Sequence, residues 1–190
     1  LDSSELTVKR SPEKLMVGYC YTFTLLHTAF LRAKGIPSRA RCGFVSYFDE
    51  GKWIDHWVTE YVDNNKWRLI DAHAGRNTVG RDEFQDAGTA WLLCRSGQAE
   101  PSSYGVSQFG LWGWDELRGS VVNDFGALNK AEYGHWEWCT ALDIENKTNP
   151  DKELDAKIDL IAEVCAGEAQ TDKVTQLYST ENSFHPPSES

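Results

Sequence analysis

The spacing of apolar residues first indicates a helix near the start of the chain. Between residues 20 and 34, apolar side chains recur at helical spacing, at Phe23, Leu26, Phe30 and Leu31. Gly35 and Pro37 follow, and this combination stops a helix. Where the helix begins is left open, because Ser11-Pro12 could start it early and Gly18 could interrupt it just before Cys20.

A different pattern follows, with three runs rich in β-branched and aromatic residues: Ala40–Phe48, Trp53–Val62 and Lys66–Asp71. These runs predict antiparallel strands. Asn64-Asn65 separates the last two, and asparagine tolerates the positive φ angles of a two-residue hairpin turn.

That turn fixes the register of the hairpin and places two polar residues together. Cross-strand partners have numbers that sum to 129, so Val58 lies opposite Asp71. His56 shares a face with Val58, and Asp71 is therefore its diagonal neighbour on that face. A bulge that shifts the register by one residue would separate the two side chains.

The second half of the chain reads as mainly helical. Tryptophans occur there in segments that glycines interrupt, at Trp91, Trp112, Trp114, Trp136 and Trp138. An apolar stripe at helical spacing follows, at Leu117, Val121, Phe125 and Leu128. Asn149-Pro150 then predicts the start of a helix with Leu154, Ile158, Ile161 and Cys165 facing inward and Gly167 as its stop. We expect core positions for most of the tryptophans.

Length and composition set the domain organisation. The 190 residues, 41% of them hydrophobic, suffice for one core without a disulfide or metal. We expect a core over residues 1–78, a helical, Trp-rich extension packed on it over residues 79–178, and a disordered tail over residues 179–190, where Pro186-Pro187 lies among Ser and Glu.

Charge and hydropathy limit the classes of binding partner that we expect. The net charge is −10, which disfavours binding to nucleic acid or to an anionic membrane surface. The imbalance is concentrated in residues 79–190, with 8 Lys/Arg against 20 Asp/Glu. This acidic half is expected to be a solvated surface, although it could attract a basic peptide or an amine. No run reaches the roughly 18 apolar residues of a membrane span.

The five cysteines, at positions 20, 42, 94, 139 and 165, lie far apart and form none of the close pairs of a zinc ribbon. Their odd number leaves at least one thiol unpaired, and a reducing, cytoplasmic setting fits this usage. Cys20 is a candidate nucleophile if its helix starts at Gly18-Tyr19, because a helix N-terminus favours the thiolate. If the helix begins at Pro12, Cys20 is mid-helix and the argument fails.

Cys20, His56 and Asp71 become a catalytic set if the Cys20 helix packs across the face that carries His56 and Asp71. The carboxylate would fix the imidazole tautomer, and the imidazole would activate the thiol for acyl transfer. His73, opposite His56, could tune the site or, as we favour, cap the strand end. Asp55 should point to the other face into solvent. A zinc site of Cys20, His56 and His73 lacks a fourth ligand, so we expect no metal and no cofactor.

These residues occur in an order that resembles the transglutaminase-like superfamily. The segments are Gly18-Tyr19-Cys20, Leu31-Arg32-Ala33-Lys34-Gly35-Ile36-Pro37-Ser38-Arg39, His56-Trp57-Val58-Thr59-Glu60 and Trp67-Arg68-Leu69-Ile70-Asp71. The family has a cysteine at a helix N-terminus, an Arg-x-x-Gly-Ile-Pro-x-Arg turn, a His-x-Trp-x-Glu strand and an aspartate that ends the next strand. Trp91–Arg95 and Ala127–Glu132 are also similar to segments of some stand-alone bacterial members.

The resemblance implies an α+β fold of the papain-like cysteine-protease and transglutaminase kind, a helix packed on a small antiparallel sheet. It implies Cys20 as the nucleophile, His56 as the general base and acid, and Asp71 as the residue that orients the imidazole, with Arg39 and Trp57 in support. The chain departs from the family where Ala72-His73 replaces the usual proline and small residue. The short stretch before Cys20 also leaves the second oxyanion donor unassigned.

The expected activity is cysteine-dependent acyl transfer or hydrolysis on an amide, through a thioester. The substrate would be a peptide, an isopeptide or a glutamine side chain, with an amine as a possible acceptor, and hydrolysis is favoured by family analogy. Removal of asparagine-linked sugar would use the same triad. The rival hypothesis is a non-catalytic protein- or peptide-binding module that keeps the fold.

Overall fold

The structure, a computed structural model, describes residues 8–15, 17–131 and 152–185. Trp136, Trp138, Cys139 and the expected helix start at Asn149-Pro150 lie outside these ranges. Within them the chain is α+β, a mixed sheet with helices, as the sequence predicts.

Helix α1 spans Cys20–Ala33, so Cys20 is its first residue. Tyr19 precedes it with extended backbone, φ −131°, and its N–H donates to the Thr22 hydroxyl at 3.1 Å. Pro12–Lys14 forms a separate 3-10 turn, η1. The helix therefore does not run on from Pro12, and the prediction that places Cys20 at a helix N-terminus is confirmed.

Strands β1 (Ser38–Val45), β2 (Trp53–Asp63) and β3 (Lys66–Asp71) form the antiparallel part of the sheet. Asn64 and Asn65 both have positive φ, 49° and 59°, as a tight hairpin turn requires. The pairs run from Asp63 with Lys66 to Thr59 with Ile70. The predicted register is confirmed over this stretch.

Four short strands complete the sheet: β4 (Arg76–Val79), β5 (Phe84–Asp86), β6 (Tyr104–Val106) and β7 (Leu111–Trp112). The order is β4-β3-β2-β1-β5, with β6 parallel to β2 and β7 paired to β6. At two to four residues each, these strands are too short to show an alternating pattern in the sequence. The expectation of a mainly helical second half therefore missed them.

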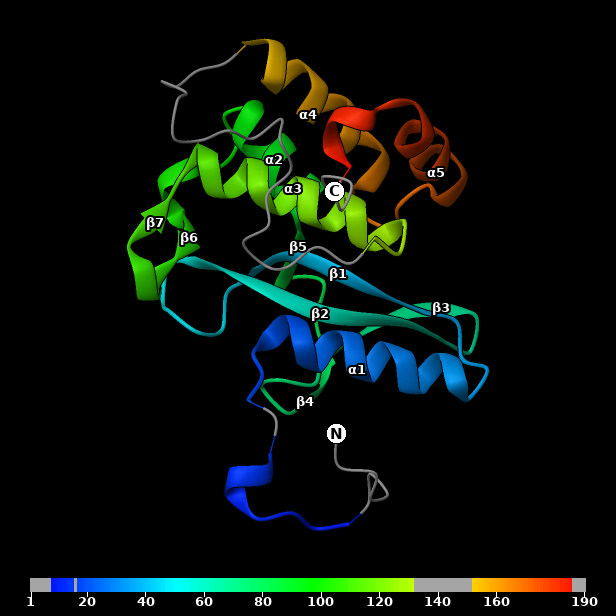
Figure 1. Ribbon diagram of the computed structural model, residues 1–190. Helices are drawn as coiled ribbons and strands as arrows, with labels where there is room; N and C mark the ends of the chain where they lie inside the picture. The colour runs from blue at the N-terminus through cyan, green and yellow to red at the C-terminus, as the bar shows by residue number, and fades with distance from the viewer. Residues whose placement is uncertain (1–7, 16, 132–151, 186–190) are drawn as a thin grey trace.

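The helices of the second half are α2 (Ala87–Arg95), α3 (Trp114–Leu128), α4 (Lys152–Cys165) and α5 (Thr171–Thr180). Figure 1 shows α1 lying along β2 and these four helices gathered beyond β1. Both predicted stripes are largely buried, Leu117, Val121 and Phe125 on α3 and the four named residues on α4. Gly167 ends the second of these segments with φ 64°.

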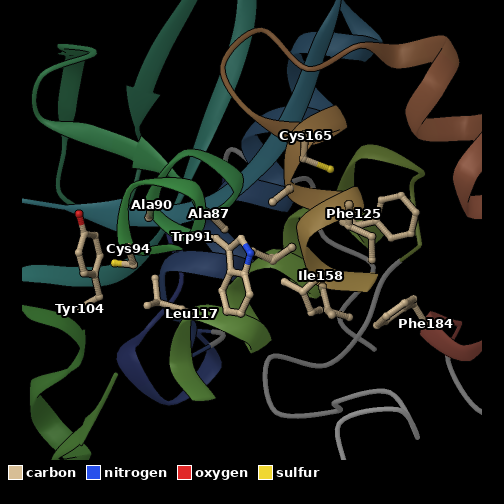
Figure 2. Close-up of a cluster of buried hydrophobic side chains, with 14 of the residues drawn as sticks. Ala87, Ala90, Trp91, Cys94, Tyr104, Leu117, Phe125, Ile158, Cys165 and Phe184 are labelled. Carbon is tan, nitrogen blue, oxygen red and sulfur yellow. The ribbon is translucent and has the colours of Figure 1, made fainter. Parts of the chain in front are cut away.

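The main core fills the space between these helices and the sheet. Trp91 of α2 is fully buried, and Figure 2 shows it among side chains of α3 and α4, such as Leu117 and Ile158. Phe184, in the 3-10 turn η6 (Asn182–Phe184), is also fully buried in this cluster. The expected disordered tail is thus structured up to residue 185, because one aromatic side chain joins the core.

A buried arginine ties β1 to the helices of the second half. The Arg41 guanidinium donates to both carboxylate oxygens of Asp124 on α3 and, at 3.1 Å, to Glu60 on β2. It also donates to the backbone carbonyls of Cys165 and Gly167 at 2.8 and 2.9 Å. The two regions expected from the sequence, residues 1–78 and 79–178, therefore share one sheet and one charged cluster.

Candidate active site

A pocket of about 620 Å³ opens where the start of α1 meets β2. Its walls come from four segments far apart in the chain: Tyr19, Cys20, Phe48, Asp49, Ile54, Asp55, His56, His73, Val106, Ser107, Gln108 and Phe109. The candidate nucleophile and the candidate base thus line the same cavity.

His56 and Asp71 form the hydrogen bond that the hairpin register predicts. His56 Nε2 lies 2.8 Å from Asp71 Oδ2, and both side chains are buried. With the Nε2 proton directed at the carboxylate, the lone pair of the imidazole is on Nδ1. His56 is therefore held in the tautomer that a general base needs.

Asp71 is itself held by three further donors. The Tyr47 hydroxyl donates to Oδ2 at 2.6 Å, and the backbone N–H groups of His73 and Ala74 donate to Oδ1 at 2.9 Å. Burial alone would raise the pKa of Asp71, but the contact with His56 and these hydrogen bonds lower it to about 2. The carboxylate is therefore ionised at neutral pH and fixed in orientation.

Cys20 reaches the pocket where one edge of β2 has no partner strand, although the other edge is paired with β1. The pairs with β6 end at Ile54, and the pairs with β3 begin at Thr59. Between them, the backbone N–H of Trp57 hydrogen-bonds the Cys20 sulfur, and so does that of Tyr21. The first turn of α1 thereby docks onto the edge of β2 that has no partner strand at this point.

The Cys20 thiol is neutral in this resting arrangement. Burial, followed by the negative charges of Asp55 and Asp71, raises its pKa to about 12, against the opposing effect of the two N–H groups. The helix N-terminus by itself predicts the reverse shift. Desolvation and two carboxylates outweigh the partial charge of the helix end.

Two expectations about the faces of β2 need correction. Helix α1 contacts Trp57 and Thr59, through the Tyr21–Trp57 ring pair at 4.7 Å and the His27–Thr59 contact at 3.1 Å. These side chains alternate with His56 along the strand. The helix therefore packs on the face opposite His56, and Cys20, its first residue, reaches the pocket that His56 lines.

Asp55 is the second correction, because it is half-buried in the pocket rather than solvated. It accepts a hydrogen bond from Ser120 of α3 at 3.0 Å, and the Cys42 sulfur lies 3.8 Å away. The position does alternate with His56 as expected. Helix α3 excludes solvent from Asp55. The sequence pattern around Asp55 does not predict that α3 packs there.

The expected supporting residues serve the fold. Arg39 donates to Glu60 at 2.6 Å and stacks on Trp67, with its guanidinium carbon 4.2 Å from the ring. Trp57 belongs to a buried cluster with Cys42 and the start of α1. It directly follows His56, so Val58 is at the third position of the His-x-Trp-x-Glu pattern.

Sequence reasoning missed Tyr47 and Phe48, which follow β1. Tyr47 bonds Asp71, and the Phe48 ring packs edge-on to His56 at 4.9 Å between centroids. Ser107 and Gln108 were also missed, although their O–H and N–H groups could donate to an acyl oxygen in the pocket. No local motif marks these four residues, since only folding brings them to the site.

His73 lies beside His56, with the two rings 5.6 Å apart. Ligand atoms of His56, Asp71 and His73 lie within 4.8 Å of one another. This is a different group from the Cys20, His56 and His73 set considered from the sequence, because the carboxylate takes the place of the thiol.

Comparison with known families fits this geometry. Residues 3–72 match the family model described as the transglutaminase-like superfamily. We call these matched residues the transglutaminase-like core. Members of the superfamily are often cysteine-dependent acyltransferases or hydrolases. Searches of curated proteins and of solved structures gave no match.

The transglutaminase-like core ends one residue after Asp71, so the match spans Cys20, His56 and Asp71 and excludes His73. In the part of the chain that the structure describes, no helix is both long and apolar enough to span a bilayer.

Proposed function

We propose that the protein is a cysteine-dependent acyltransferase or hydrolase that acts on amides through a thioester. Cys20 is the nucleophile, His56 the general base and acid, and Asp71 the residue that orients the imidazole. The observation that carries the proposal is the 2.8 Å contact between His56 Nε2 and Asp71 Oδ2 at a pocket that Cys20 also lines.

The chemistry starts from a neutral thiol. As the Cys20 sulfur attacks the amide carbon, its proton passes to Nδ1 of His56, and Asp71 stabilises the imidazolium. The same proton then goes to the leaving amine as the carbon–nitrogen bond breaks. Water or a second amine attacks the thioester and loses a proton to His56, which releases the acid or the new amide and restores the thiol.

Developing negative charge on the acyl oxygen needs donors in the pocket. We assign the backbone N–H of Cys20, at the start of α1, as one such donor. Gln108 and Ser107 also line the pocket and are the side chains from which a second donor would come.

The proposal is tested by trapping the acyl-enzyme. The protein is incubated with glutamine-containing peptides and asparagine-linked glycopeptides, with and without a fluorescent primary amine, and analysed by intact-mass and peptide-mapping mass spectrometry. We expect an adduct on Cys20, absent in Cys20→Ala and retained in Cys94→Ala. Conversion to the acid indicates hydrolysis, amine incorporation indicates transfer, and an aspartate product indicates deglycosylation.

Asp71→Asn is the sharper variant, because it keeps the shape of the side chain. An amide at this position favours the wrong imidazole tautomer, and we expect turnover to fall about 10⁴-fold with little loss of substrate binding. An equal rate in Asp71→Asn and the parent protein would contradict the assigned role of Asp71.

A binding module without catalysis is the second candidate, and the raised pKa of Cys20, about 12, favours it. If His56 does not take the proton of this thiol, the pocket would bind peptides without forming a thioester. Peptide binding by calorimetry together with no Cys20 adduct and no product across the peptide set would establish this alternative and overturn the enzyme proposal.

A further inference from the structure

We propose that His56, Asp71 and His73 form a binding site for one Zn²⁺ ion that blocks the pocket chemistry. The binding itself does not depend on the proposed acyl transfer, and only the inhibition rests on it. The ligand atoms already lie within 4.8 Å of one another. Around tetrahedral zinc, ligand atoms are separated by about 3.3 Å, so a modest rotation of one side chain completes the set.

The side chain that can rotate is that of His73. It is exposed, whereas His56 and Asp71 are buried. Its backbone is fixed, because the His73 N–H donates to Asp71 Oδ1 at 2.9 Å. The ring can therefore turn toward the other two ligands without movement of the main chain.

The other two ligands are already oriented by groups around them. The Tyr47 hydroxyl and the Ala74 N–H hold the carboxylate, and Phe48 packs against the His56 ring. Such outer groups raise metal affinity because they reduce the reorganisation on binding. The His56 Nε2 and Asp71 Oδ2 atoms, 2.8 Å apart, are close enough to share one ion in place of one proton.

This replacement explains why the ion would block catalysis. Zinc binds the Nε2 lone pair of a neutral imidazole, so the proton that was on Nε2 moves to Nδ1. Nδ1 then carries a hydrogen and cannot accept the proton of the Cys20 thiol. The charge of the imidazole does not change, and no proton is released from it.

The ligand chemistry favours zinc over calcium or magnesium, which require mostly oxygen ligands. Two imidazoles and a carboxylate leave the fourth position of tetrahedral zinc open for water. The local charge also suits a cation, because Asp49 and Asp55 line the pocket and the described lining contains no lysine or arginine.

The binding is tested by titrating zinc chloride into the protein by isothermal calorimetry at neutral pH, with a magnesium chloride titration alongside. We expect one zinc per chain and weaker magnesium binding. His73→Ala should lower zinc affinity by about tenfold or more, a loss of the size seen when metal-site groups are removed. His185→Ala, a histidine of the described chain that stacks on Tyr178 outside the pocket, is the matched control.

Two results would overturn the site: zinc affinity equal in His73→Ala and the parent protein, or magnesium binding as tight as zinc. Where acyl transfer is measurable, zinc should inhibit the parent protein and should inhibit His73→Ala much less, when each protein is compared with its own rate without zinc. If the acyl transfer proposal fails, the calorimetric comparison still decides the zinc site, so the two failures are distinguishable.

Discussion

At the residue scale, the charge next to Cys20 determines how readily its thiol ionises. Asp55 and Asp71 both disfavour the thiolate, but they differ in their other contacts. Asp71 is hydrogen-bonded to the His56 imidazole, whereas Asp55 accepts a hydrogen bond from Ser120 of α3. A substitution at Asp55 therefore offers a way to change the pKa of the Cys20 thiol without changing the orientation of His56.

Asp55→Asn removes a negative charge beside the sulfur, so the pKa of Cys20 should fall from its raised value. We expect faster alkylation of Cys20 by iodoacetamide at pH 7 to 8, by about tenfold for each unit that the pKa falls. Peptide-mapping mass spectrometry against pH measures this rate. An alkylation profile that is the same in both proteins would show that Asp55 does not act on the thiol.

At the scale of elements, the β2–β3 hairpin sets the position of Asp71 relative to His56. Its turn depends on two residues with positive φ, Asn64 and Asn65. Asparagine tolerates this conformation, and β-branched residues do not. The turn thus controls both the stability of the hairpin and the geometry of the site.

Asn65→Val should lower the free energy of unfolding by about 1 to 2 kcal/mol, because a β-branched residue is strained at positive φ. Asn65→Gly should be neutral or slightly stabilising, since glycine adopts this region freely. Thermal or denaturant unfolding of both variants measures the difference. Equal stability of the Val and Gly variants would mean that the turn does not adopt this conformation in solution.

At the scale of the whole molecule, buried charges join the transglutaminase-like core to the helices that follow it. Arg41 is fully buried and contacts Asp124, Glu60 and the end of α4. Loss of one partner from such a group leaves a buried carboxylate without compensation. Arg41 therefore adds a buried charged contact to the apolar core that joins the two halves.

Arg41→Met should lower the free energy of unfolding by about 3 to 5 kcal/mol, because Asp124 loses its buried cation. Arg68→Met is the control, since Arg68 is exposed and lies 4.0 Å from Asp63, a surface pair worth at most about 1 kcal/mol. Denaturant unfolding compares the two variants. A small effect at Arg41, similar to that at Arg68, would contradict the structural role of the cluster.

Stability should also depend on pH through Glu116 of α3. Burial first, and then the charges of Asp55 and Asp115, raises its pKa from 4.5 to about 7. Between these values the folded protein holds a proton that the unfolded chain has released, so stability falls as pH rises. The loss is about 3 kcal/mol. Glu116→Gln should remove it and be more stable at pH 8, as denaturant unfolding at pH 5 and pH 8 will show; an unchanged pH dependence would contradict the shift.

The sequence by itself determined the local structure around Cys20, His56 and Asp71. The apolar spacing marked α1, and Gly35 marked its end. Asn64-Asn65 specified the hairpin turn, and the turn fixed which residues of β2 and β3 share a face. These features depend on contacts between residues close in the chain, which is why the His56–Asp71 pair follows from counting alone.

Only the tertiary structure decided the surroundings of that pair. The short strands β4 to β7 exist because longer strands offer them partners, and the pocket wall at Ser107 and Gln108 comes from one such connection. The pKa of Cys20 is raised, whereas its place at a helix N-terminus predicts a lowered pKa. The reason is that desolvation of the thiol and its distance from the Asp55 charge depend on how α1 and α3 pack. The burial of a side chain and the electrostatic field at that side chain are sums over neighbours that are distant in the sequence. Both are therefore set only when the chain packs.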